Sequence, residues 1–183
     1  MDRRQALKLT SIAVGGSVIG AELFLVGCKN NTVDDVLFSE EVLALLDEIG
    51  ETILPETERS PGAKAAKIGL FMKDMVTDCY SDKEQPIFMK GIHEVNNTSI
   101  DTYSRGFLEL NSQERLNLLL QFDKEAQNRN NEETPHFFSM MKQLTILGYF
   151  TSEPGATQAL RYNPTPGKFI GCIPYKKGDK AWA

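Results

Sequence analysis

Apolar residues recur every three or four positions through most of residues 39–151, which is the spacing of helices with one buried face. The first helix is predicted between Ser39, a residue type that caps helix N-termini, and Pro55, which ends helices. Its buried face is expected to contain Val42, Leu46, Ile49 and Ile53. The opening pattern therefore indicates a helical fold.

Two further helices are predicted after the turn signal Ser60-Pro61-Gly62-Ala63. The apolar stripe of the second helix ends on Cys79, so this thiol is expected on the core side. That stripe consists of Ile68, Phe71, Met72, Met75, Val76 and Cys79. The sequence Ser81-Asp82-Lys83-Glu84 is typical of a capping box and opens the third helix. Its buried face is expected to contain Phe88, Ile92, Val95 and Ser99.

The last two helices are predicted from the same two signals, a capping residue at the start and an apolar stripe. Asn111-Ser112-Gln113-Glu114 repeats the capping pattern ahead of the fourth helix. Its stripe is predicted as Leu116, Leu119, Leu120 and Asp123, with Leu118 and Phe122 beside it. Thr134 and Pro135 are predicted to cap the fifth helix, with the proline at its first position. This helix is the most hydrophobic and should be central; its face is Phe137, Met140, Met141, Leu144, Leu147 and Phe150.

These five segments predict an all-α fold, a single compact helical domain over residues 38–183. From residue 163 to 183 the helical period is lost, and Pro and Gly become frequent. This tail nevertheless contains Phe169, Ile170, Ile173, Tyr175 and Trp182. Disordered tails rarely contain such side chains, so we expect them to pack either across the protein's own helices or against a partner.

Residues 1–28 have the order of regions found in an export signal: a charged start, an apolar run and a small-residue end. The adjacent Arg3 and Arg4 are similar to a twin-arginine signal, a route that exports folded cargo. An ordinary membrane helix is the alternative, but Glu22 and several glycines make this segment a poor bilayer span.

The signal closes on Leu25-Val26-Gly27-Cys28, which looks like a bacterial lipoprotein cleavage box. Cys28 is therefore expected to become a lipidated first residue, followed by a polar tether over residues 29–37. The predicted product is exported and stays on a membrane surface of the periplasm or cell envelope.

Charge and cysteine content narrow the classes of function. The chain has a formal net charge of −5 and no basic cluster, which argues against nucleic acid and against electrostatic docking to anionic lipid. With Cys28 lipidated, Cys79 and Cys172 could form a disulfide in an oxidising compartment. The alternatives are two buried thiols or a bridge from one cysteine to another subunit.

No pattern in the chain selects a catalytic or metal site. His93 and His136 belong to no metal-binding or catalytic motif and are expected to form structural hydrogen bonds. The acidic group Asp47, Glu48 and Glu51 is expected to be the solvated side of the first helix. We therefore assign this chain no catalytic residue, no metal and no bound cofactor.

Two runs near the C-terminus carry a family resemblance. The sequence LTILGYFTSEPGA at residues 144–156 and its continuation ALRYNPTPGKFIGCIP at 159–174 resemble the gluconate 2-dehydrogenase subunit 3 family. The earlier Ile53-Leu54-Pro55 followed by Ser60-Pro61-Gly62-Ala63 is also similar to that family. The resemblance spans roughly residues 38–183.

This resemblance implies a small helical subunit that accompanies a large FAD-dependent oxidoreductase of the glucose–methanol–choline (GMC) type. The large partner oxidises a sugar or sugar acid, holds the FAD, and often passes electrons to a cytochrome c subunit. The small subunit supplies the export signal and carries the folded partner across the membrane. The lipoprotein box is not general to the family, so here the small subunit is also expected to anchor the complex.

The predicted partner interface lies in the aromatic residues that flank the Pro and Gly turns of the family motif, because interfaces favour such residues. They are Tyr149, Phe150, Tyr162, Phe169 and Tyr175. Alternatively, the motif locks the tail onto the fifth helix. A second interpretation of the whole chain is a free-standing envelope lipoprotein that acts as an enzyme or binds a ligand. A pocket in which carboxylates converge on His93 or His136 would favour it.

Overall fold

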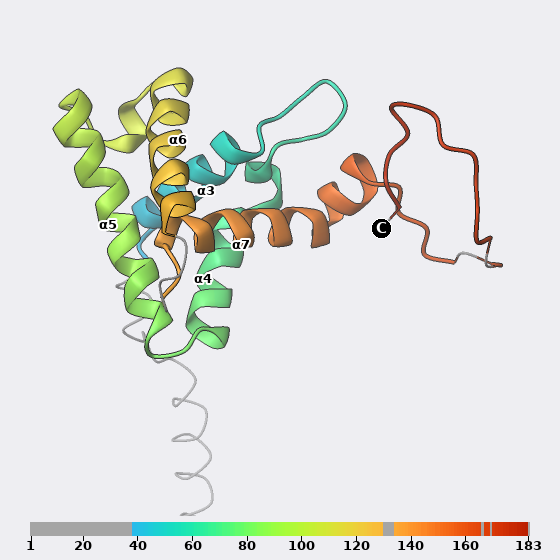
Figure 1. The fold of residues 1–183 in the computed structure, drawn as a ribbon, viewed down its shortest axis with the longest axis horizontal. Helices are drawn as coiled ribbons and strands as arrows, with labels where there is room; N and C mark the ends of the chain where they lie inside the picture. Colours follow the sequence, from blue (N-terminus) through green and yellow to red (C-terminus); the bar gives the residue numbers. More distant parts are fainter. Residues whose placement is uncertain (1–37, 130–133, 166, 169, 183) are drawn as a thin grey trace, which may run out of the picture. The chain divides into compact units, whose positions relative to one another are not determined.

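The computed structural model describes residues 38–129, 134–165, 167–168 and 170–182. The predictions for Arg3, Arg4, Cys28 and Phe169 lie outside these residues. The described part contains five α-helices and no β-strand, which confirms the all-α prediction (Figure 1). The helices are α3 (Glu40–Ile53), α4 (Ile68–Cys79), α5 (Glu84–Tyr103), α6 (Ser112–Asn128) and α7 (Phe137–Thr151). None of these helices is long and apolar enough to cross a bilayer.

Three short helical turns join or extend the main helices. The 3₁₀ turns η1 (Ala63–Ala66) and η2 (Phe107–Glu109) precede α4 and α6, respectively. The π-helical turn η3 (Gly155–Ala159) follows α7.

Helix α7 lies at the centre of the packing, as its hydrophobicity predicts. It contacts each of α3, α4, α5 and α6. Its buried apolar residues are Phe138, Met140, Met141, Leu144 and Tyr149. Leu147, which was expected on the buried face, is 48% exposed, so the face is rotated relative to the predicted one.

Two glycines allow the helices to approach closely. A Cβ atom on Gly69 of α4 would lie 2.5 Å from the carbonyl oxygen of Leu43 in α3. A Cβ atom on Gly148 of α7 would lie 2.5 Å from a ring carbon of Phe71 in α4. These distances are shorter than van der Waals contact, so larger residues at either position would push α3 or α7 away from α4.

The predicted helix starts are largely confirmed by hydrogen bonds. The Ser39 hydroxyl accepts from the Val42 N–H at 3.4 Å, and Asn111 exchanges both capping-box bonds with Glu114. The predicted start of the fifth helix is wrong, because the N-cap is His136 rather than Thr134 or Pro135. Its Nδ1 accepts from the Phe138 N–H at 3.1 Å, which confirms a structural hydrogen bond for this histidine.

Two predicted faces need correction. In α6 the buried residues are Leu118, Leu119 and Phe122, whereas Leu116 and Leu120 of the predicted stripe are 39% and 47% exposed. At the end of α4, Cys79 is exposed rather than on the core side. In both cases helical spacing identified an apolar stripe, but the neighbouring helices cover a narrower or rotated part of it.

Candidate functional site

The family motif at the end of α7 forms an internal contact rather than an exposed surface. Tyr149 is only 3% exposed, and its hydroxyl donates to the Pro61 carbonyl oxygen at 2.5 Å. Tyr149, predicted as an interface residue, is therefore buried within the described domain. Phe150 is half-buried and packs edge-on against the Tyr149 ring, with ring centroids 5.2 Å apart. Tyr149 thus joins α7 to the turn at Pro61, and Phe150 packs against the core.

The residues after Tyr149 turn the chain from α7 into η3. The Ser152 hydroxyl donates to the Tyr149 carbonyl oxygen at 2.6 Å and accepts from the Gly155 N–H at 3.2 Å. Any Cβ on Gly155 would lie 1.8 Å from that same carbonyl oxygen, so the turn requires glycine. The motif thus fixes η3 against α7. This part of the motif has a structural role, as in the alternative to a partner interface.

Beyond η3 the described residues between 161 and 182 form a loop whose two ends meet, which we call the C-terminal loop (Figure 1). The Arg161 N–H donates to the Ala181 carbonyl oxygen at 2.7 Å. The Arg161 guanidinium carbon lies 4.7 Å from the centroid of the Trp182 ring, a cation–π distance. Lys180 also donates from Nζ to the Gln158 carbonyl oxygen. These contacts close the neck of the loop.

The apolar side chains of this loop face solvent. Every described residue from 161 to 182 is exposed, and Tyr175 is the most exposed of its large hydrophobic residues, at 76%. The expectation that the tail packs across the protein's own helices is therefore not met. Two of the predicted interface residues, Tyr162 and Tyr175, lie on this accessible surface. Cys172 is also exposed and free, so neither cysteine is a buried thiol.

The loop also collects positive charge. It contains five of the chain's 20 Lys and Arg residues but only one of its 25 Asp and Glu residues. The single acid, Asp179, accepts from the Lys176 N–H at 2.9 Å and so holds a turn around Gly178. The net charge of the whole chain is negative because acidic residues outnumber basic ones outside this local cationic segment.

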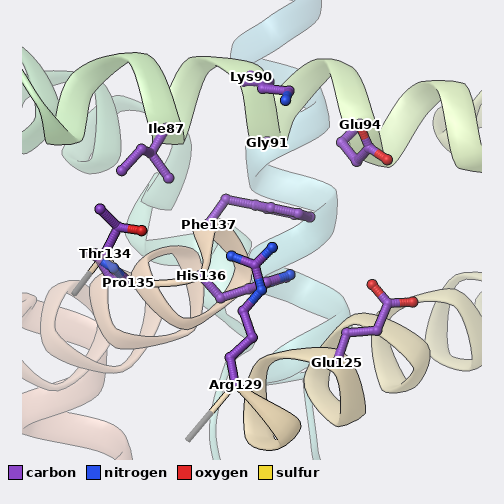
Figure 2. A pocket seen from close by; sticks show the side chains of 10 residues that line it. All are labelled: Ile87, Lys90, Gly91, Glu94, Glu125, Arg129, Thr134, Pro135, His136 and Phe137. Carbon is purple, nitrogen blue, oxygen red and sulfur yellow. The ribbon is translucent and has the colours of Figure 1, made fainter. Parts of the chain in front are cut away.

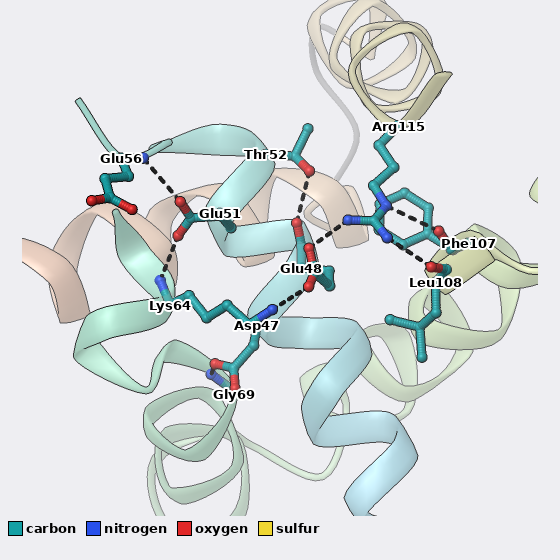
Figure 3. A network of polar contacts seen from close by, with 10 residues as sticks. All are labelled: Asp47, Glu48, Glu51, Thr52, Glu56, Lys64, Gly69, Phe107, Leu108 and Arg115. Atoms are coloured by element: carbon teal, nitrogen blue, oxygen red, sulfur yellow. Dashed lines mark hydrogen bonds and ion pairs between the residues drawn. The ribbon is translucent and has the colours of Figure 1, made fainter. Parts of the chain in front are cut away.

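The acidic group on α3 is part of the fold rather than a solvated face (Figure 3). Glu48 pairs with Lys64 and, at 2.5 Å, with Arg115, and the exposed fraction of its side chain is only 19%. Glu51 accepts from the Lys64 N–H at 2.9 Å, and Asp47 accepts from the Gly69 N–H at 2.7 Å. These carboxylates hold η1, α4 and α6 against α3, so the prediction of a solvated side is wrong.

Two hollows lie beside the histidines named in the sequence. The first, of about 340 Å³, lies where α5, the end of α6 and the start of α7 meet; its lining includes His136, Glu94, Glu125, Lys90 and Arg129 (Figure 2). The second, of about 490 Å³, is lined in part by His93, Glu41 and Glu109.

The groups that line these hollows are not arranged for one reaction. His136 uses Nδ1 to cap α7, and Glu109 accepts from the Gly106 N–H at 3.2 Å. His93 and Glu94 are exposed on α5. In Figure 2 the Phe137 ring lies between α5 and the His136 ring, with the two carboxylates to one side. Among the described residues, no group of three or more His, Cys, Asp or Glu is placed to hold a metal ion.

Two shifted pKa values belong to the junction of α4 and α5, away from both hollows. The hydroxyl and backbone N–H of Ser81 donate to Glu84 and lower the pKa of its carboxyl group. Burial, together with the nearby negative charge of Glu84, raises the pKa of Tyr80. The Ser81–Glu84 hydrogen bonds lie at the start of α5, and neither pKa change identifies a reactive group.

Fold and surface together define a small all-α domain that ends in an exposed, cationic and apolar loop. A sequence model of the family described as gluconate 2-dehydrogenase subunit 3 matches residues 40–167. The chain therefore belongs to this family, as its C-terminal motifs indicated, and the family is that of a small subunit of a dehydrogenase complex. Searches of curated proteins and of solved structures returned no match.

Proposed function

We propose that this chain is an accessory subunit that binds a large FAD-dependent dehydrogenase of the GMC type, exports it and holds it at the cell envelope. The observation that carries the proposal is the family match over residues 40–167. The sequence of the leader adds the other two roles. Arg3 and Arg4 direct the folded complex to the twin-arginine route, and lipidated Cys28 keeps it on the membrane.

The FAD and the oxidation belong to the partner. A dinucleotide-binding turn needs a glycine-rich segment between a strand and a helix, and the described residues contain no strand that could supply one. The partner would oxidise a sugar or sugar acid and pass electrons to an acceptor such as a cytochrome c subunit. In this arrangement the small subunit contributes binding surface and transport rather than chemistry.

One observation favours the second interpretation, a free-standing protein that binds a ligand. Each histidine lines a hollow that also contains two carboxylates. In the hollow beside His136, the carboxylates of Glu94 and Glu125 are exposed, whereas His136 is only 7% exposed and caps a helix. This makes the accessory subunit the better supported function.

The test is to express the full chain together with the large subunit and to measure dehydrogenase activity and bound flavin in each cell fraction. Replacing Arg3 and Arg4 with lysine should leave both in the cytoplasm. The Lys8→Arg variant, a conservative change in the same charged region, should export them normally. Activity outside the cytoplasm with the double lysine variant would refute the carrier role.

The membrane anchor is tested separately with Cys28→Ser. This variant should release active flavoprotein into the soluble exported fraction, whereas Cys79→Ser should leave it on the membrane. If wild-type chain never co-purifies with a flavoprotein, the accessory role is wrong. Substrate turnover by the isolated chain would support the second interpretation instead.

A further inference from the structure

We propose that the C-terminal loop is a preshaped docking element that inserts into an apolar groove with an acidic rim on the large dehydrogenase subunit. The inference rests on the proposed function, which supplies the partner, and adds the surface and chemistry of the contact. Three features of the loop carry it: its closed neck, its exposed apolar residues and its charge.

The neck limits the conformations of the loop before binding. The Arg161–Ala181 hydrogen bond, the stacking of Arg161 on Trp182 and the Lys180–Gln158 contact tie the end of the chain back to the start of the loop and to η3. A tied loop loses less conformational entropy on binding than a free tail of the same length. The neck thus favours a segment that binds as a unit.

Three large apolar residues of the loop are exposed. Ile170, Ile173 and Tyr175 are 56%, 48% and 76% exposed, respectively, and they lie within six consecutive residues. Such a cluster loses contact with water only when another surface covers it. The residues therefore provide the apolar part of an interface.

Positive charge surrounds this apolar segment in the sequence. Lys168 precedes it, Lys176 and Lys177 follow it directly, and Lys180 lies three residues further on. The one acidic side chain of the loop, Asp179, already holds the turn after Lys176. A binding surface that matches this pattern has an apolar floor and carboxylates at its edge.

A protein groove fits this loop better than a bilayer surface. Segments that lie in the membrane interface are typically amphipathic helices with free aromatic residues, whereas residues 170–175 are irregular and include Pro174. The tryptophan, the residue best suited to the interface, is stacked under Arg161 at the neck. Extended, Pro-containing segments are one form of chain that binds in grooves on other proteins.

The experiment uses the tagged full chain, co-expressed with the large subunit and immobilised, and follows flavin absorbance and dehydrogenase activity during washes of rising salt concentration. Lys176→Gln with Lys177→Gln should lower the salt concentration that elutes half of the flavoprotein severalfold, because the acidic rim loses its counter-charges. The matched control, Lys83→Gln with Lys124→Gln, removes the same charge from two exposed positions, the N-cap of α5 and the surface of α6, and should elute like wild type.

A second variant separates the apolar contact from the charge. Ile170→Ser with Ile173→Ser should make the flavoprotein dissociate at least about tenfold faster, at low and at high salt alike. Both residues are exposed, so the circular dichroism spectrum and melting temperature should match those of wild type.

The outcomes are distinct. Failure of wild-type chain to retain any flavoprotein refutes the proposed function. Normal retention by both loop variants refutes this inference alone and leaves the proposed function intact. Full chain with Cys28→Ser is also mixed with phosphatidylglycerol vesicles. If the loop variants lose vesicle binding while they retain the flavoprotein normally, the bilayer is the occupant and the inference is wrong.

Discussion

Arg115 joins three separate elements of the fold, and its removal should be the most costly single polar substitution in the described domain. From α6 its guanidinium donates to the Phe107 carbonyl oxygen at 3.2 Å and to the Leu108 carbonyl oxygen at 2.7 Å, both in η2 (Figure 3). It also pairs with Glu48 of α3 at 2.5 Å, and only 16% of its side chain is exposed.

The size of the effect follows from these contacts. A hydrogen bond to a charged group is worth about 1.5–3 kcal/mol, and Arg115→Ala removes two such bonds to carbonyl groups. Water can reach part of the site, so we use the lower end and obtain about 3 kcal/mol for the two bonds. Glu48 keeps its pair with Lys64, so the lost ion pair adds at most about 1 kcal/mol.

The assay is urea unfolding of the full chain carrying Cys28→Ser, followed by circular dichroism. Arg115→Ala should lower the free energy of unfolding by about 3–4 kcal/mol. Arg115→Lys should restore about 1 kcal/mol, because lysine keeps the charge but not the planar fork of donors. Arg105→Ala is the comparison: this arginine side chain is 46% exposed, pairs with Glu114 and donates one long hydrogen bond, 3.4 Å, to the Glu109 carbonyl oxygen, so its removal should cost at most about 1 kcal/mol.

The reasoning is refuted if Arg115→Ala and Arg105→Ala cost the same. That result would mean that the carbonyl contacts of Arg115 contribute nothing beyond an exposed ion pair. A large loss for Arg115→Lys, equal to that of alanine, would instead assign the whole effect to the geometry of the guanidinium.

Two further predictions concern the family motif and the start of α5. Tyr149→Phe removes the hydroxyl that donates to the Pro61 carbonyl oxygen and should lower the unfolding free energy by about 1–2 kcal/mol without weakening retention of the partner. If Tyr149→Phe retains the partner more weakly while its stability is unchanged, Tyr149 contacts the partner. Ser81→Ala should raise the pKa of Glu84 toward its ordinary value in a carboxyl ¹³C titration. Because the folded state lowers the pKa of Glu84, the ionised carboxylate stabilises the folded state at neutral pH. This stabilisation is lost as the pH falls through the folded-state pKa, so Ser81→Ala should show a smaller loss of stability in acid than wild type. An unchanged pKa would contradict the role of the hydroxyl.

Residues close in sequence made the helices predictable. Ser39 and the pair Asn111 and Glu114 begin their helices as expected, because a cap binds backbone groups within three residues of itself. The apolar period located all five helices for the same reason. The start of α7 was misplaced because His136, whose Nδ1 is rarely considered as a cap, accepts the bond instead of Thr134.

Contacts between distant segments could not be predicted in this way. The pairing of Glu48 with Arg115 joins residues 67 positions apart, and nothing near either residue identifies the other. Cys79 was expected to be buried and is exposed, whereas Tyr149 was expected to be accessible and is buried. Helical spacing defines an apolar stripe but not which part of that stripe a neighbouring helix covers.

The sequence by itself determined the all-α class and the family, since each depends on local spacing or on a contiguous motif. Only the tertiary structure decided which motif residues are accessible. It buried Tyr149 in the core and left Tyr175 on a loop closed by Arg161 and Trp182. The physical reason is that burial depends on how helices rotate and approach one another, and the packing of side chains from distant parts of the chain sets that rotation.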